Sequence, residues 1–294
     1  MTSFRDLREA TAWEFPFEEN ALLRGIKVDN PEGQTVHFLH GNGLCGKTYW
    51  PMLQGLTEKY ALMLHDCVGH GDSDPGQGFI SWEQSAQHVH DVIQYKMDKG
   101  ALQGPLLGLG HSFGGVLTLK LAAKYPDMFR CLVLMDPIIM PEAFIDMGAG
   151  MPNPLADKTR KRRNHWDNPE QAFSYFRSKS AYKDWSDKSL NSFITHALYG
   201  NKEGGLSLKC PPSVEADIFS STPEGLWEDI RSIKVPTTIL YGDSSYPFME
   251  SACQQASENP NISIEKLEGS HCFMQENPAV ACERTMFHYE RLMA

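Results

Sequence analysis

Residues 108–115 read Gly-Leu-Gly-His-Ser-Phe-Gly-Gly, and this stretch decides the fold of the chain. The apolar run Pro105–Leu109 predicts a buried strand before it, and the Leu- and Ala-rich run Phe113–Lys124 predicts a helix after it. A G-x-S-x-G motif between a strand and a helix holds its serine in a tight, strained turn. The flanking glycines are needed because a Cβ would clash in that turn. Ser112 then lies at the amino terminus of a helix, where the dipole favours developing negative charge, and is the candidate nucleophile.

Short apolar runs alternate with amphipathic runs on both sides of this motif. We expect further strands at Gln34–Leu39, Tyr60–His65, Cys131–Met135, Val235–Gly242 and Ile262–Leu267. We expect further helices at Lys47–Lys59, Ser81–Lys99, Phe248–Ser257 and Pro278–Met293. This alternation predicts an α/β fold with a mostly parallel central sheet that is flanked by helices on both faces.

The alternation breaks between residues 138 and 224, where no clear strand is present and aromatic residues accumulate. We interpret this segment as an inserted helical cap, so that residues 1–137 and 225–294 form the core. The aromatic content favours an apolar acyl or alkyl pocket. The basic run at residues 158–163 is typical of a solvated helix face.

A glycine-rich turn, His40-Gly-Asn-Gly43, follows the strand expected at Gln34–Leu39. Such a turn can aim a backbone N–H at the substrate of the serine. The N–H groups of Asn42 and Phe113 would then form an oxyanion hole, in which one donor is worth about 3 kcal/mol in the transition state.

A histidine stands in the loop after the last expected strand, in Gly269-Ser-His-Cys-Phe273. A serine hydroxyl needs a base to take its proton, and a histidine near its ordinary pKa is the natural base. His271 is therefore the candidate general base. We expect His111 to pack against neighbouring loops and His70 to shape a turn.

These motifs, in this order, resemble those of the α/β-hydrolase superfamily, and the likeness extends over nearly the whole chain outside the cap. The branch that looks most similar contains cap-bearing esterases, dehalogenases, epoxide hydrolases and carbon–carbon bond hydrolases. The HGN turn is similar to that of haloalkane dehalogenases, but those enzymes use an aspartate nucleophile. Ser112 at this position implies acyl transfer.

The resemblance also raises the question of the acid that orients His271. Most relatives place this acid as the third residue past the glycine that ends the strand at 237–241, which here is Ser245. Two carboxylates remain as candidates: Asp136, at the end of the strand Cys131–Met135, and Asp243, one residue past Gly242. We favour Asp136, because some lipases and dehalogenases of this fold carry their acid there, and keep Asp243 as the alternative.

Composition narrows the classes of partner. The chain of 294 residues has 27 Lys and Arg against 37 Asp and Glu, and this net charge of −10 disfavours nucleic acids and anionic membranes. Neither a metal-ligand spacing nor a phosphate loop is present, so we expect no cofactor and no metal. Seven scattered cysteines, no signal peptide and no membrane span favour a cytoplasmic protein; the oligomeric state stays open.

Together these features predict a serine hydrolase that cleaves a small or medium carboxylic ester through an acyl-serine; a thioester or an activated amide is a further option. Two alternatives remain. One is a carbon–carbon bond hydrolase that acts on vinylogous diketones. The other is a slow-turnover, hydrolase-like ligand sensor whose basic run at 158–163 contacts a partner protein.

Overall fold

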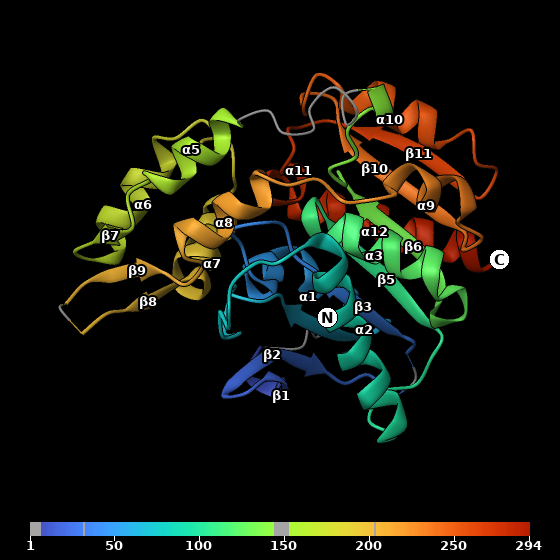
Figure 1. Ribbon diagram of the computed structural model, residues 1–294, viewed down its shortest axis with the longest axis horizontal. Coiled ribbons are helices and arrows are strands. Elements are labelled where there is room, and N and C mark those ends of the chain that lie inside the picture. The colour runs from blue at the N-terminus through green and yellow to red at the C-terminus, as the bar shows by residue number, and fades with distance from the viewer. Residues whose placement is uncertain (1–6, 32, 144–152, 203) are drawn as a thin grey trace.

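The computed structural model is built around one eight-stranded sheet (Figure 1), and it describes residues 7–31, 33–143, 153–202 and 204–294. The strands, in spatial order, are β1 (Thr11–Glu18), β2 (Ala21–Val28), β4 (Ala61–Asp66), β3 (Thr35–Leu39), β5 (Leu106–His111), β6 (Phe129–Met135), β10 (Thr237–Gly242) and β11 (Ile262–Leu267). Neighbours from β4 to β11 are parallel, whereas β2 pairs antiparallel with β1 and β4. This confirms the predicted α/β fold with a mostly parallel sheet.

Helices cover both faces of the sheet. One face packs against α2 (Trp82–Asp98), α3 (Phe113–Lys124), α9 (Leu226–Ser232) and α10 (Met249–Ala256). The other packs against α1 (Trp50–Leu56) and α12 (Pro278–Met293), next to the short α11 (Phe273–Glu276). The described residues of this part also form three 3₁₀ turns: η1 (Leu7–Glu9), η2 (Gly46–Tyr49) and η3 (Pro126–Met128). The helix expected at Lys47–Lys59 is thus split into η2 and α1.

The first two strands form a hairpin that the sequence interpretation missed. Pro16 lies inside β1 and weakens its strand pattern. The proline is tolerated because β1 is the edge strand of the sheet, where a missing ladder N–H costs little.

The segment inserted between β6 and β10 lies to one side of the sheet in Figure 1. Its described part holds α5 (Pro154–Arg160), α6 (Pro169–Arg177), α7 (Asp187–Ala197) and α8 (Pro212–Phe219). It also holds a small antiparallel sheet of β7 (His165–Trp166), β9 (Leu206–Leu208) and β8 (Leu198–Gly200), which corrects the expectation of no strand. Strands of two or three residues are too short to show a period-2 pattern. Part of the expected cap, residues 144–152, lies outside the described residues.

Most aromatic side chains of this segment pack on one another. Trp166, Tyr175, Phe176, Tyr182, Trp185 and Phe193 form a cluster with ring centroids 4.9–6.1 Å apart. Trp166, Phe176 and Phe193 are fully buried in it. The cluster is therefore part of the hydrophobic core, continuous with the packing of α1 and α12 on the sheet, and aromatic content alone does not indicate an apolar substrate pocket.

The parallel strands all end at one edge of the sheet, which is where ligands bind in open α/β folds. The loops after β3, β5, β6 and β11 carry Asn42, Ser112, Asp136 and His271 at that edge. Among the described residues, no helix is both long and apolar enough to cross a membrane.

Candidate active site

Ser112 occupies a strained turn between β5 and α3. Its backbone has φ +51° and ψ −114°, a conformation that costs a non-glycine residue about 1–3 kcal/mol. The turn is held because the Ser112 N–H donates to the carbonyl of Met135 at 3.1 Å. A Cβ on Gly110 would lie 2.5 Å from the carbonyl oxygen of Gly114, and one on Gly114 would lie 2.4 Å from that of Leu39. Only glycines fit at these two positions, as the motif predicts.

His271 bridges Ser112 and Asp136. Its Nε2 lies 2.9 Å from Ser112 Oγ, and its Nδ1 lies 2.7 Å from Asp136 Oδ1. An ionised carboxylate can only accept, so Nδ1 carries the proton and Nε2 is free to accept the serine hydroxyl. This is the arrangement in which an imidazole can take a proton from the serine and later return it.

Asp136 is fully buried, and each of its oxygens has donors. Oδ2 accepts the N–H of Gly242 at 2.8 Å, and Oδ1 accepts the hydroxyl of Ser245 at 2.7 Å as well as His271. Ser245, at the position where the resemblance implies an acid, therefore donates a hydrogen bond to Asp136 at the end of the neighbouring strand. The sequence shows that residue 245 is not an acid, but it does not predict the hydrogen bond from Ser245 to Asp136.

Asp243, the alternative acid, is exposed and lies outside this group. Its Oδ1 accepts the N–H of Gly269 at 3.1 Å and the hydroxyl of Ser244 at 3.0 Å. Two hydrogen bonds lower the pKa of the Asp243 carboxyl: the one from Gly269 has the larger effect and the one from Ser244 the smaller. Asp136 therefore lies against His271, whereas Asp243 stays at the start of the loop that follows β10.

The glycine-rich turn lies against the amino terminus of α3, where the N–H of Gly114 donates to the carbonyl of His40 at 3.1 Å. Within the described part of the chain, the backbone N–H groups of Asn42 and Phe113 have no hydrogen-bond partner. Both remain available to an oxyanion, as an oxyanion hole requires.

The Asn42 side chain, unlike its backbone N–H, is bound to other groups. Its Nδ2 donates to the carbonyl of Glu215 on α8 at 2.9 Å, and its Oδ1 lies 3.3 Å from His70 Nε2. His70 donates from Nδ1 to Val68 and accepts the N–H of Gly43 at Nε2, so it shapes the turn as expected. Burial lowers the pKa of His70 to about 3, which keeps this acceptor neutral.

The basic run at 158–163 is only partly a solvated face. Arg160, with a 43% exposed side chain, pairs with Asp217, whereas Arg162 is 17% exposed and lies 2.5 Å from Glu215 Oε2. The Glu215 carboxylate lies against the glycine-rich turn, because a Cβ on Gly43 would be 2.8 Å from its Oε1. The interpretation of the run as a solvated face is wrong for Arg162, and a tertiary contact of this kind leaves no sequence signal.

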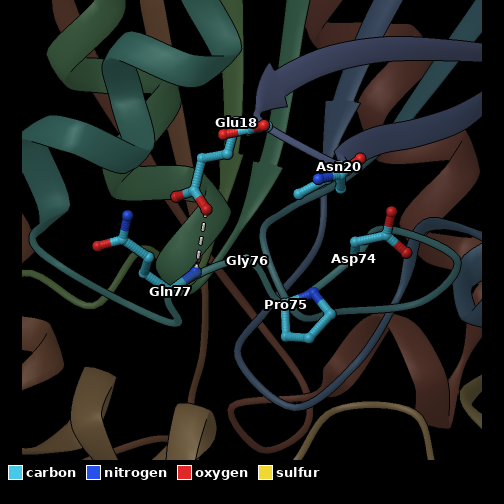
Figure 2. A pocket seen from close by; sticks show the side chains of 8 residues that line it. Glu18, Asn20, Asp74, Pro75, Gly76 and Gln77 are labelled. Carbon is cyan, nitrogen blue, oxygen red and sulfur yellow. Dashed lines mark hydrogen bonds between the residues drawn. The ribbon is translucent and has the colours of Figure 1, made fainter.

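A surface recess of about 510 Å³ lies elsewhere, between the β1–β2 turn and residues 74–77 (Figure 2). Its lining includes Glu18, Asp74 and Gln77, and the Gln77 N–H donates to Glu18 at 3.1 Å. None of the residues named for the site lines it. Among the described residues, no three His, Cys, Asp or Glu side chains are grouped as metal ligands.

The chain is similar to several known proteins. Abhydrolase domain-containing protein AKT2 of Alternaria alternata is 32% identical over 102 residues, which are 35% of this chain and 37% of that protein. Lipase 3 of Moraxella sp. (strain TA144) is 25% identical over 217 residues, 73% of this chain and 64% of the lipase. The chain thus spans between about a third and two thirds of these relatives.

The solved structure of E-2-(acetamidomethylene)succinate hydrolase matches this chain with a TM-score of 0.79 at 18% identity. The match covers 96% of this chain and 99% of that one. At that identity the likeness shows the fold alone. The family model described as alpha/beta hydrolase family matches residues 38–284. This chain therefore belongs to the alpha/beta hydrolase family.

Proposed function

We propose that the protein is a serine hydrolase that cleaves a small or medium carboxylic ester. The observation that carries this proposal is the continuous hydrogen-bonded series Ser112 Oγ, His271 Nε2, His271 Nδ1 and Asp136 Oδ1. A hydroxyl, an imidazole and a buried carboxylate in this order are the parts that acyl transfer needs.

The reaction proceeds in two halves. Ser112 Oγ attacks the ester carbonyl while His271 Nε2 takes the hydroxyl proton, and the N–H groups of Asn42 and Phe113 hold the oxyanion. The tetrahedral intermediate collapses, the C–O bond to the alcohol breaks, and His271 gives its proton to the departing alkoxide. Water then attacks the acyl-serine, with His271 again as base, and releases the carboxylic acid and free Ser112.

The inserted segment has the role of a cap in this proposal. Residues 138–224 form the cap, and residues 1–137 and 225–294 form the core that carries the reacting groups. The contact between the Asn42 side chain and the carbonyl of Glu215 supports the role of a cap, because it joins α8 of the segment to the glycine-rich turn at residues 40–43, the oxyanion turn. All seven cysteines are free thiols, which supports a cytoplasmic location.

The test is an assay of purified protein on p-nitrophenyl esters of increasing chain length, with Ser112→Ala beside it. We expect turnover of at least one ester and a loss of several orders of magnitude in the variant, since the members of such a triad act as a unit. A fluorophosphonate should label Ser112 and no other serine.

Two outcomes would contradict the proposal. Labelling at another serine, or an active Ser112→Ala variant, would remove Ser112 as nucleophile. Turnover of a vinylogous diketone in place of esters would favour the carbon–carbon hydrolase instead.

A further inference from the structure

A second series of hydrogen bonds, two of them buried and one partly buried, uses none of the reacting groups' side chains. The N–H of Gly41, in the oxyanion turn, donates to Tyr49 Oη at 3.0 Å. Tyr49 Oη lies 2.6 Å from His111 Nδ1, and His111 Nε2 lies 2.9 Å from the backbone carbonyl oxygen of His271. The series therefore joins the oxyanion turn to the loop that carries the base.

The chemistry of the two ends fixes the direction of every bond. The carbonyl of His271 can only accept, so His111 carries its proton on Nε2. Burial lowers the pKa of His111 well below its ordinary value, so the ring is neutral and its Nδ1 is an acceptor. Tyr49 must then donate to Nδ1 and accept from Gly41. Each group in the series has a partner and one allowed orientation.

Packing leaves these side chains little freedom. Tyr49 is fully buried, with its ring 4.8 Å from that of Phe38 at an angle of 63°, and His111 is 2% exposed. A Cβ on Gly41 would lie 2.6 Å from His111 Nδ1, so the imidazole sits directly against the oxyanion turn. A displacement of the oxyanion turn would break the buried hydrogen bond from Gly41 to Tyr49, and a displacement of the other loop would break the partly buried one from His111 to the His271 carbonyl. Either loss costs free energy, because it leaves a polar group without its partner.

We propose that Tyr49 and His111 are positioning residues that fix the spacing between the oxyanion turn and the base loop. With this spacing fixed, the N–H of Asn42 can hold the oxyanion of the same carbonyl group that Ser112 attacks when Nε2 of His271 takes its proton. The inference rests on the proposed serine hydrolase function and assigns neither side chain a contact with substrate. It also gives His111, which the sequence analysis treated as packing, a directional role.

Tyr49→Phe tests the series, because it removes one oxygen and keeps the ring. We expect kcat to fall about ten- to a hundredfold with KM changed less than threefold, since the loss acts on transition-state geometry. Tyr289→Phe is the matched control: its hydroxyl is equally buried and donates to the carbonyl of Gly108 at 3.0 Å. The control should lower the melting temperature by a similar amount and leave kcat within twofold.

His111→Gln supplies a second, independent measurement. The glutamine amide nitrogen can replace Nε2 and donate to the His271 carbonyl, but the side chain has no acceptor at the position of Nδ1, where Tyr49 donates. The double variant with Tyr49→Phe should therefore be no slower than the slower single variant. Additive losses would mean two unrelated structural effects and would overturn the proposal. Where Tyr49→Phe does not fold, His111→Gln alone decides, and a kcat within twofold of wild type would overturn the proposal.

A spectroscopic readout is independent of turnover. In ¹⁵N-histidine NMR spectra, the resonance lost in His111→Gln should belong to a neutral ring protonated at Nε2. An Nδ1–H tautomer, or a Tyr49→Phe variant as fast as wild type, contradicts the series. Wild-type protein that no fluorophosphonate labels at Ser112 would instead contradict the proposed function, so the two failures are distinguishable.

Discussion

The ends of β6 and β10 lie side by side in the sheet, yet they place their carboxylates differently. Asp136, directly after β6, is fully buried and reaches His271 at 2.7 Å. Asp243, directly after β10, is exposed and accepts the N–H of Gly269. Two aspartates at equivalent distances from adjacent strands thus have opposite surroundings.

Backbone conformation accounts for the difference. Asp136 has φ +44°, in the left-handed region, so the chain turns as β6 ends, although its N–H still donates to the carbonyl of Leu240 on β10. The N–H of Asp243 donates in the same way to Leu267 on β11 at 2.8 Å, but the φ of Asp243 is not positive. The left-handed conformation directs the Asp136 side chain to the base, and Asp243, which lacks it, does not reach the base. Position after a strand therefore does not by itself identify the acid.

The largest expected effect is at Asp136. Asp136→Asn should lower kcat about 10⁴-fold, because the amide cannot hold His271 in the correct tautomer or stabilise the imidazolium. The measurement is steady-state ester hydrolysis, with circular dichroism to show that the variant is folded. A loss of less than tenfold would mean that His271 does not depend on this carboxylate.

The pH range of these comparisons is set by buried histidines. Burial lowers the pKa of His37 to about 3, of His40 to about 4 and of His70 to about 3. The unfolded chain binds these protons at a pKa near 6.5, so it gains protons first and the native state loses stability as pH falls from 6.5 towards 4. In this range each histidine lowers the free energy of unfolding by about 1.4 kcal/mol for each pH unit, so the three together lower it by about 4 kcal/mol for each pH unit.

Urea unfolding at pH 7.5, 6.5 and 5.5 measures this dependence. We expect the free energy of unfolding to change little between the first two values and to drop sharply at the third. A flat profile would mean that these histidines are accessible to protons in the native state. Activity variants should therefore be compared above pH 6.5.

The comparison can be inverted by moving the acid to β10. In the double variant Asp136→Asn/Ser245→Asp, we expect kcat to recover about ten- to a hundredfold over Asp136→Asn. The reason is proximity: Ser245 Oγ already lies 2.7 Å from the Asp136 oxygen that meets His271. Ser245→Asp alone should be slower than wild type, because two adjacent carboxylates cannot both stay ionised. No recovery would show that only the backbone turn at 136 presents an acid to the base.

Ser245→Ala measures the hydroxyl itself. The Asp136 oxygen that meets His271 would lose one of its two donors, and a charge-assisted hydrogen bond of this kind is worth about 1.5–3 kcal/mol. Part of this stabilises ground and transition states equally, so we expect a three- to tenfold lower kcat. Ser245→Thr should restore the rate; equal activity in the alanine and threonine variants would exclude a role for the hydroxyl.

The sequence was sufficient where the signal is local. The turn around Ser112 needs glycines at fixed positions, and the alternation of strands and helices around it predicts the parallel sheet. In the structure, Ser112 Oγ and His271 Nε2 lie 2.9 Å apart. The acid was not decided, because the answer depends on the φ angle at Asp136 and on a contact with Ser245 across 109 residues. Arg162 was misread for the same reason: its partner Glu215 lies 53 residues away.

The smallest expected effect is at Asp243. Asp243→Asn keeps an oxygen that can accept the N–H of Gly269, so the loop before His271 should keep its geometry, and the carboxylate is exposed where charge is screened by water and salt. We expect kcat within twofold of wild type and a melting temperature within a few degrees. Asp243→Ala is the sharper companion, because it removes the acceptor and frees the N–H of Gly269; a modest rise in KM or a lower melting temperature there would report on the loop. If Asp243→Asn instead lost several orders of magnitude in kcat while Asp136→Asn stayed active, the exposed carboxylate would be the one that serves His271, and the geometry around Asp136 would have to change when substrate binds.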